Sequence, residues 1–104
     1  MCVPLAFTQE RRFQAAIARV AKRLPYVADV NATLGSDWAG DPAVFFMVIL
    51  ADTASGRDQL LKTSHQASQA IVQQVQPLGK WGVLPYFNFR SQSEQAHLDQ
   101  AALA

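Results

Sequence analysis

The chain has 104 residues, of which 50% are hydrophobic and only 16% are charged, with a formal net charge of +1 at pH 7. This length suits one domain, and the small net charge excludes attraction to nucleic acid or an acidic membrane through bulk electrostatics. Few charges on a small domain also indicate that part of its apolar surface is covered in an oligomer.

Cys2 is the single cysteine of the chain, so neither an internal disulfide nor a cysteine zinc cluster is expected. The first residues carry their positive charges after a short apolar run, which is the wrong order for a signal peptide. The apolar run 43–51 falls well short of the roughly 20 residues that span a membrane. We therefore expect a cytoplasmic protein with no membrane association and no cofactor.

The first predicted element is a helix that begins with Thr8 as its N-cap and ends before Pro25. An apolar stripe at helical spacing follows the cap and consists of Phe13, Ala16, Ile17, Val20, Ala21 and Leu24. The basic residues Arg11, Arg12, Arg19, Lys22 and Arg23 fall largely outside this stripe. They favour a solvated face, with nucleic-acid binding as the alternative.

Two strands are predicted next, joined by a loop. Alternation over 29–34 indicates a half-buried strand, and the turn formers of 35–42 indicate a loop. The run 44–50 is apolar at every position, which predicts a central strand covered on both faces.

A second helix is expected to start at a cap formed by Thr53 or Ser55, to run to about Gln76, and to be closed by Pro77 and Gly79. The last strand is predicted over 81–90. Its alternation places Phe87 and Phe89 beneath the helices, with the open face of the sheet receiving Tyr86, Asn88 and Arg90. From Ser91 onward we expect a short helix or a loose tail that is polar and then rich in alanine.

This order predicts a single α+β domain over 1–104, with an ordered core at about 8–91. The architecture is a two-layer αββαβ sandwich, in which a three-stranded mixed sheet carries both helices on one face. The first two strands pair antiparallel, and the second helix crosses over to a parallel third strand. This is a ferredoxin-like fold that lacks the first strand.

Such a sheet leaves one face without helices, and the central strand has apolar side chains for both faces. The open face carries either Phe45, Met47 and Ile49 or Val44, Phe46 and Val48. An exposed patch of this size usually marks a partner. We therefore expect a homo-oligomer that forms through the open sheet face or through an edge strand.

Several side chains are candidates for chemistry or binding. Asp37 and Asp41 favour turn capping, and with a histidine they could serve a small hydrolase, although every catalytic template lacks parts. Trp38 and Trp81 favour positions at the edge of the core over exposed anchors of a partner. Arg90 is expected to pair either within the chain, with Asp37, Asp41 or Glu94, or with another molecule.

Three stretches carry a resemblance to a known group: the loop SDWAGDPA at 36–43, the crossover helix, and FRSQSE at 89–94. They resemble small bacterial proteins of uncharacterised function with a DWxGDPAxF loop and an FRSxSE tail. The resemblance covers 24–94 and implies a non-enzymatic module, encoded beside a HEPN-like partner as in toxin–antitoxin pairs. It implies a shared surface that includes Ser91 together with the two loop aspartates, Trp38, Arg90 and Glu94.

The leading hypothesis is a non-enzymatic protein-interaction module, homodimeric and antitoxin-like. Its candidate partner-binding residues are Asp37, Trp38, Asp41, Tyr86, Asn88, Arg90 and Glu94. The first alternative is nucleic-acid or nucleotide binding through Arg90, Tyr86 and the basic face of the first helix. The second is a small hydrolase that uses Asp37 and Asp41.

Overall fold

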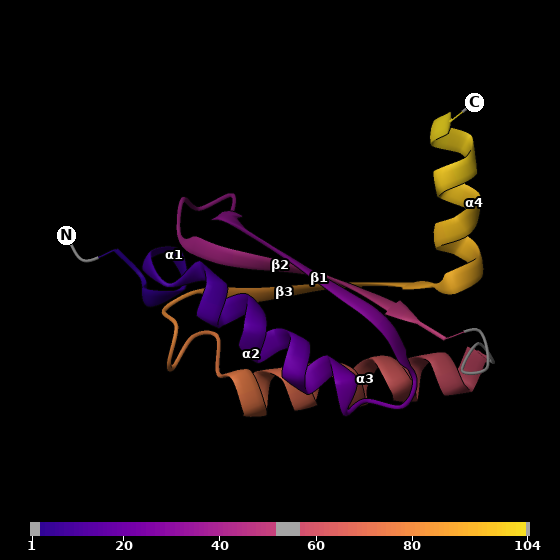
Figure 1. Ribbon diagram of the computed structural model, residues 1–104, viewed down its shortest axis with the longest axis horizontal. Coiled ribbons are helices and arrows are strands. Elements are labelled where there is room, and N and C mark those ends of the chain that lie inside the picture. The colour runs from indigo at the N-terminus through magenta and orange to yellow at the C-terminus, as the bar shows by residue number, and fades with distance from the viewer. Residues whose placement is uncertain (1–2, 52–56, 104) are drawn as a thin grey trace.

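The computed structural model describes residues 3–51 and 57–103, and its elements follow the predicted order with one short helix added at the start (Figure 1). The sheet has three strands in the order β1-β2-β3. They are β1 (Val27–Ser36), β2 (Pro42–Leu50) and β3 (Leu84–Ser91). β1 pairs with β2 antiparallel and β2 pairs with β3 parallel, which confirms the predicted α+β fold with a mixed sheet and a central second strand.

The first helix begins differently from the prediction. Thr8 ends the short helix α1 (Leu5–Thr8), where its hydroxyl donates a 3.2 Å hydrogen bond to the carbonyl of Leu5. Gln9 occupies the N-cap of α2 (Glu10–Lys22), and its side chain makes no capping hydrogen bond. The prediction of Thr8 as the cap was therefore wrong, because its hydroxyl is already used by the preceding turn.

The crossover helix α3 (Arg57–Val75) connects β2 to β3, as expected for two parallel strands. Its predicted caps, Thr53 and Ser55, lie outside the described residues. The helix ends one residue before Gln76, which adopts a φ of 54°, and Pro77 follows. The turn after α3 then delays the last strand, so that β3 begins at Leu84 and not at Trp81.

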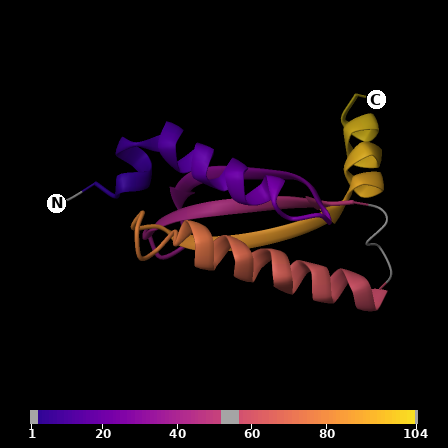
Figure 2. The same cartoon turned by 60° about the horizontal axis from the view of Figure 1, so that its bottom comes forward.

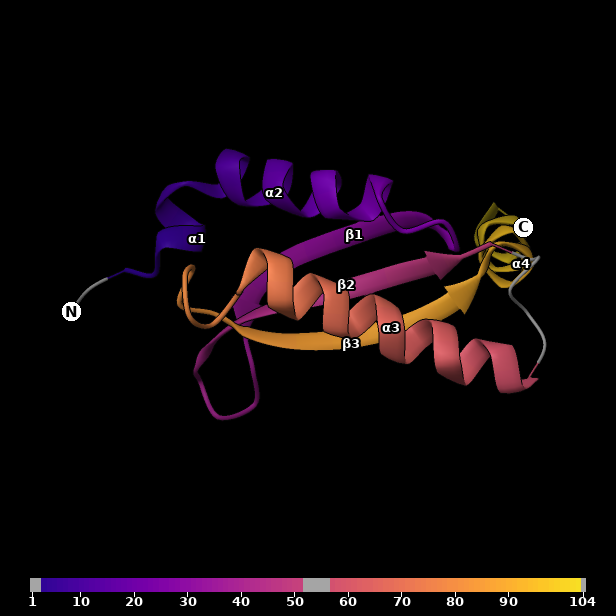
Figure 3. The same cartoon turned by 90° about the horizontal axis from the view of Figure 1, so that it is seen from below.

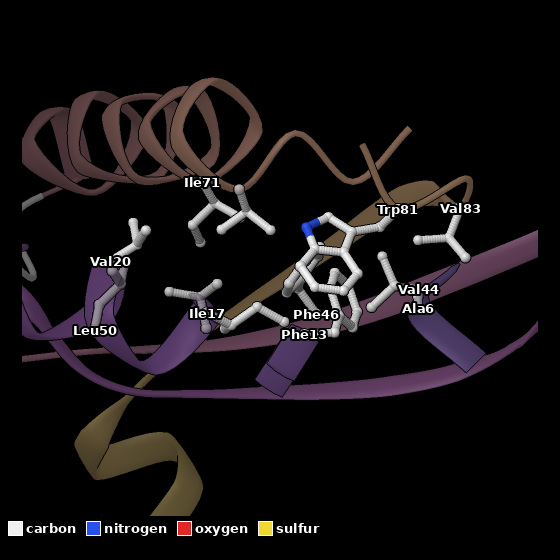
Figure 4. Packing of buried hydrophobic residues seen from close by; sticks show 12 residues of the cluster. Ala6, Phe13, Ile17, Val20, Val44, Phe46, Leu50, Ile71, Trp81 and Val83 are labelled. Carbon is white, nitrogen blue, oxygen red and sulfur yellow. The ribbon is translucent and has the colours of Figure 1, made fainter. Parts of the chain in front are cut away.

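Helices α2 and α3 cover the same face of the sheet, and their apolar stripes meet the strands there (Figure 3). The alternate residues of β2 that point into this layer are Val44, Phe46, Val48 and Leu50, all fully or almost fully buried. Phe13, Ile17 and Ile71 of the helices lie against them (Figure 4). Phe87 and Phe89 pack at the margin of this core, as predicted. The open face therefore carries Phe45, Met47 and Ile49, the first of the two predicted sets, but only Phe45 and Met47 reach solvent, because Ile49 is buried.

The C-terminal segment forms a helix, α4 (Gln92–Leu103), at the end of β3. It projects from the sheet on the side away from α2 and α3 in Figure 1, and Figure 2 shows it standing clear of both helices at the end of β3. Together, α1 and α4 extend the regular structure beyond the range 8–91 predicted for the ordered core. The open face is consequently bordered by α4 at one end and by the β1–β2 loop at the other.

Candidate functional site

The loop between β1 and β2 is organised by one side chain, that of Asp37. Its Oδ1 accepts hydrogen bonds from the backbone N–H groups of Ala39 and Asp41, each 2.9 Å long. Two backbone hydrogen bonds of 3.0 Å close the same loop, from the N–H of Asp37 to the carbonyl of Asp41 and from the N–H of Gly40 to the carbonyl of Asp37. Gly40 has a φ of +85°, a conformation that residues with a Cβ rarely adopt. The DWAGD sequence is thus a loop that holds its own shape.

The second carboxylate oxygen of Asp37 anchors this loop to the last strand. Tyr86 donates a 2.8 Å hydrogen bond from its hydroxyl to Oδ2 of Asp37. This bond, with the loop N–H donors, lowers the pKa of Asp37 below its usual value. The same hydrogen bond, with smaller effects of desolvation and of the negative charges of Asp37 and Asp41, raises the pKa of Tyr86. The contact is therefore most favourable when Asp37 is an ionised carboxylate and Tyr86 is a neutral phenol.

Three aromatic rings gather at this point and form what we call the aromatic corner: Trp38, Phe45 and Tyr86. The Trp38 ring meets the Tyr86 ring edge-on, and the Phe45 ring stacks on the Tyr86 ring, with centroid distances of 5.5 Å in both pairs. Trp38 is 86% exposed and Phe45 is 37% exposed. The expectation that Trp38 would lie at the edge of the core was wrong, because the hydrogen bonds of Asp37 fix the loop in a shape that presents the indole to solvent.

Trp81 behaves in the opposite way and confirms the expectation of a core position. It is 5% exposed, and its ring lies 5.1 Å from that of Phe13 (Figure 4). Its indole Nε1 is buried and has no hydrogen-bond partner among the described residues. The two tryptophans of the chain therefore have different roles, one in packing and one at the surface.

Arg90 lies at the other end of the open face and does not meet the predicted acidic partners. Its guanidinium donates a 3.2 Å hydrogen bond to the amide oxygen of Gln95 in α4. Glu94 is engaged elsewhere: its Oε2 accepts from the N–H of Ser91 at 3.3 Å, and the Oγ of Ser91 accepts from the N–H of Glu94 at 3.1 Å. This reciprocal pair is a capping box that starts α4. Among the described residues, Arg90 therefore does not form the predicted pair with Asp37, Asp41 or Glu94.

The capping box changes the interpretation of the FRSQSE stretch. Ser91 and Glu94 have a local structural role, whereas Asn88 is exposed on β3 between Tyr86 and Arg90. The spacing Ser-x-x-Glu before a helix was a signal present in the sequence that the prediction did not use. Gln95, which contacts Arg90, could not be found without knowing that the first turn of α4 begins directly at the end of β3.

The residues predicted for a hydrolase or for nucleic-acid binding are arranged differently from those hypotheses. Both carboxylate oxygens of Asp37 are occupied by hydrogen bonds within the fold. In the described part of the chain, no three His, Cys, Asp or Glu side chains are grouped as a metal site would need. Arg90 and Tyr86 lie on the open face, while α2, which carries the basic residues in its sequence, packs on the other face of the sheet (Figure 3). These two sets therefore do not form one binding surface.

A separate groove lies on the helical layer. It has a volume of about 500 Å³ and is lined by residues of α1, α2 and the turn after α3, among them Arg12, Arg19, Lys80 and Trp81. The ammonium group of Lys80 lies 5.7 Å from the centre of the Trp81 ring. Three cations next to an aromatic ring can receive an anionic group.

The fold and these two surfaces define a small ferredoxin-like α+β domain whose sheet lacks the first strand and is open on one face. No family model matches the chain, and no curated protein matches its sequence. Among solved structures, the chain is similar to one titled "MamM CTD H264A-E289A-C267S", with a TM-score of 0.54 and 12% identity. The match covers 82% of this chain and 98% of that one. At this identity the similarity concerns the fold, which is compatible with an interaction module. Within the described residues, no helix is both long and apolar enough to cross a bilayer.

Proposed function

We propose that this chain is a non-enzymatic protein-interaction module that forms a homodimer through the open face of its sheet. The observation that carries the proposal is the exposed indole of Trp38 in the aromatic corner. An indole that is 86% exposed leaves a large apolar surface in water. Tryptophan is also the residue type most enriched among the anchors of protein interfaces.

The construction of the loop supports a binding role for Trp38. Both carboxylate oxygens of Asp37 accept hydrogen bonds that fix the loop, and the ring of Tyr86 contacts the Trp38 indole edge-on. An indole fixed in this way loses little conformational freedom when a partner covers it, which makes it an efficient anchor. A flexible loop with the same exposed indole would bind more weakly.

The central strand supports a second copy as the occupant. β2 places Phe45 and Met47 on the open face, where they are part-exposed, whereas α2 and α3 cover the other face of the sheet (Figure 3). A face that is apolar in the middle can pack against its own copy around a two-fold axis, because identical patches are then buried together. The sheet-to-sheet distance of about 10 Å in such packing suits side chains of this size.

The test is the oligomeric state of the purified chain by sedimentation velocity over a dilution series. The unmodified chain should dissociate from dimer to monomer on dilution. Trp38→Ala should raise the dissociation constant at least about 30-fold, the size expected for an interface anchor. Leu78→Ala is the matched control, because Leu78 is 57% exposed on the turn after α3 and lies outside the proposed interface. A chain that stays monomeric at every concentration, or a Trp38→Ala variant that dimerises normally, would refute the proposal.

The antitoxin-like role implied by the resemblance stays a prediction that none of the comparisons addresses. It would require a different protein as the physiological partner. The same aromatic corner would then be the first surface to examine, and co-expression with the neighbouring gene product would provide the partner.

A second candidate function, the binding of a phosphate-bearing ligand, is favoured by the groove beside Trp81. Arg12 and Arg19 are about two turns apart on α2, and Lys80 approaches from the turn after α3. A titration with a short single-stranded RNA at low and high salt tests this function. Binding should weaken with salt and with Arg12→Ala plus Arg19→Ala, but not with Lys62→Ala on α3. Absence of binding at low salt would exclude it.

A further inference from the structure

The open face is built as cross-strand rows, in which each strand contributes one residue. Pairing between the strands fixes four such rows: the short-side-chain row Gly35–Ala43–Leu84 next to the hairpin loop, and then Thr33–Phe45–Tyr86, Asn31–Met47–Asn88 and Asp29–Ile49–Arg90, of which we number the last three. The aromatic corner occupies the first row, and the hairpin loop with Asp37 and Asp41 lies just beyond it. Arg90 occupies the last row, beside α4. The face is therefore acidic and aromatic at one end and carries a guanidinium at the other.

Arg90 cannot reach the acidic end of its own chain. It lies four residues from Tyr86 along β3, which corresponds to about 13 Å in a strand. Its guanidinium instead donates a hydrogen bond to Gln95. A guanidinium has five N–H donors in a planar fork, so a single amide oxygen leaves most of its binding capacity for another carboxylate or an aromatic ring.

Asn88 lies midway between these two ends, two residues from Tyr86 and two from Arg90. Consider two sheets facing each other around a two-fold axis that runs across the strands and passes near Asn88. The second copy then runs in the reverse direction, and Arg90 of each copy lies over Tyr86 of the other. The contact occurs twice, as an isologous interface requires.

We propose that the homodimer has this register, and that Arg90 of one copy binds the acidic aromatic corner of the other. This inference rests on the proposed function and specifies its geometry. The guanidinium would lie against the rings of Trp38 and Tyr86 of the second copy, close to the carboxylates of Asp37 and Asp41. A cation over an aromatic face and next to a carboxylate gains from both interactions when the partner displaces water.

Helix α4 limits how far the second copy can slide along the strands. It stands on the open side of the sheet at the end where β3 finishes (Figure 1). In the proposed register, the hairpin loop of the second copy comes to lie beside α4. Each copy would therefore be bounded at one end by its own α4 and at the other by the α4 of its partner.

One competing register is specific enough to be tested against this one. A two-fold axis parallel to the strands keeps the rows aligned, and it places Arg90 opposite Asp29 of the second copy, because both belong to the same row. Asp29 is exposed at the edge strand β1. The two registers thus differ in the aspartates that face Arg90. These are Asp37 and Asp41 in the proposed register and Asp29 in the competing one.

Charge reversal distinguishes the registers, with Asp41 as the position to change at the acidic corner. Asp37 is unsuitable because it holds the loop, whereas Asp41 joins the loop hydrogen bonds through its backbone N–H and carbonyl. We expect Asp41→Lys and Arg90→Glu each to weaken self-association at least tenfold, because each brings like charges together twice. Asp29→Lys should leave self-association unchanged. Thermal unfolding of each variant verifies that it is folded.

Mixing gives the decisive result. An equimolar mixture of Asp41→Lys and Arg90→Glu should form a heterodimer, because the introduced lysine then faces the introduced glutamate, and the unchanged Arg90 faces the unchanged Asp41. Sedimentation velocity with one variant fluorescently labelled measures this. If Arg90→Glu formed a heterodimer with Asp29→Lys and not with Asp41→Lys, the proposed register would be wrong, but the proposal of a homodimer would still hold. A monomeric unmodified chain would instead refute the proposed function itself.

Neutral variants provide the same test if a reversed charge prevents folding. Arg90→Gln and Asp41→Asn should each weaken dimerisation several-fold and reduce its dependence on salt, since a charge pair is lost in both cases. Asp29→Asn should have neither effect. Equal salt dependence in the unmodified chain and in Arg90→Gln would overturn the proposed contact.

Discussion

The hydroxyl of Tyr86 donates a 2.8 Å hydrogen bond to Asp37, which lies 49 positions earlier in the chain. The sheet order β1-β2-β3 means that this bond links the β1–β2 loop to the strand on the far side of β2. It fixes the position of the loop over the open face and thereby the position of the Trp38 indole. The exposed anchor of the proposed interface thus depends on one phenol–carboxylate contact.

The first prediction concerns the pH dependence of stability. Asp37 has a lowered pKa in the fold, so its contribution is present above its unfolded value near 3.8 and is lost as pH falls through the folded value. Tyr86 has a raised pKa, so its contribution is present below its unfolded value near 10.0 and is lost as pH rises through the folded value. Tyr86→Phe should therefore lower the free energy of unfolding most at neutral pH and less at both extremes.

Urea denaturation of both proteins across the pH range measures this difference. The carboxyl resonance of Asp37 should also titrate closer to its ordinary pKa in Tyr86→Phe, because the first cause of the shift is removed. Tyr26→Phe is the control, since Tyr26 is exposed and lies outside this contact. A constant difference between the two proteins at all pH values would contradict the contact.

The second prediction tests the backbone of the hairpin loop. Gly40 has a φ of +85°, and an added Cβ would meet no atom within 4 Å, so Gly40→Ala would introduce conformational strain without a clash. The expected loss of stability is about 1–2 kcal/mol. Gly79→Ala is the control, because its Cβ would have ordinary contact distance to Gln76 and its φ is not positive. Gly40→Ala should also weaken dimerisation, as the loop presents Trp38.

The central strand and the last strand explain how much of this fold could be predicted. β3 alternates around Phe87 and Phe89, so its faces followed from the hydrophobic pattern alone, whereas β2 is apolar at every position from Val44 to Leu50, so the pattern predicted its central place but not which of its faces meets the helices. The exposure of Trp38 could not be predicted in this way. It depends on the local N–H groups that donate to Asp37 and on the long-range hydrogen bond from Tyr86, and neither leaves a periodic trace in a sequence.

The third prediction concerns the capping box of α4. Ser91→Ala removes the acceptor for the N–H of Glu94 and should destabilise the start of the helix by about 0.5–2 kcal/mol. Because α4 stands away from the rest of the molecule, the loss should appear as faster amide hydrogen exchange in α4 with little change in the main core. Ser68→Ala in α3, whose hydroxyl bonds the carbonyl of His65, is the control. Faster exchange throughout the sheet would contradict this local role.

The fourth prediction uses the buried indole of Trp81. Its Nε1 finds no hydrogen-bond partner in residues 3–51 and 57–103, and a buried unsatisfied donor costs about 1–3 kcal/mol. Trp81→Phe removes this cost together with some packing volume, whereas Trp81→Ala removes the packing against Phe13 altogether. We expect Trp81→Ala to destabilise by about 3–5 kcal/mol, and Trp81→Phe by less than about 1.5 kcal/mol.

The stability of both variants is measured by urea unfolding with circular dichroism as the signal. Tryptophan fluorescence is unsuitable because both substitutions remove Trp81. Phe46→Leu is the matched control: it also reduces a buried ring in the same core but relieves no unsatisfied donor. Its loss of stability should exceed that of Trp81→Phe. If Trp81→Phe were as damaging as Trp81→Ala, the indole N–H would have to donate a hydrogen bond in solution, for instance to an enclosed water. In that case the stability of the core would depend on a polar contact and not on packing alone.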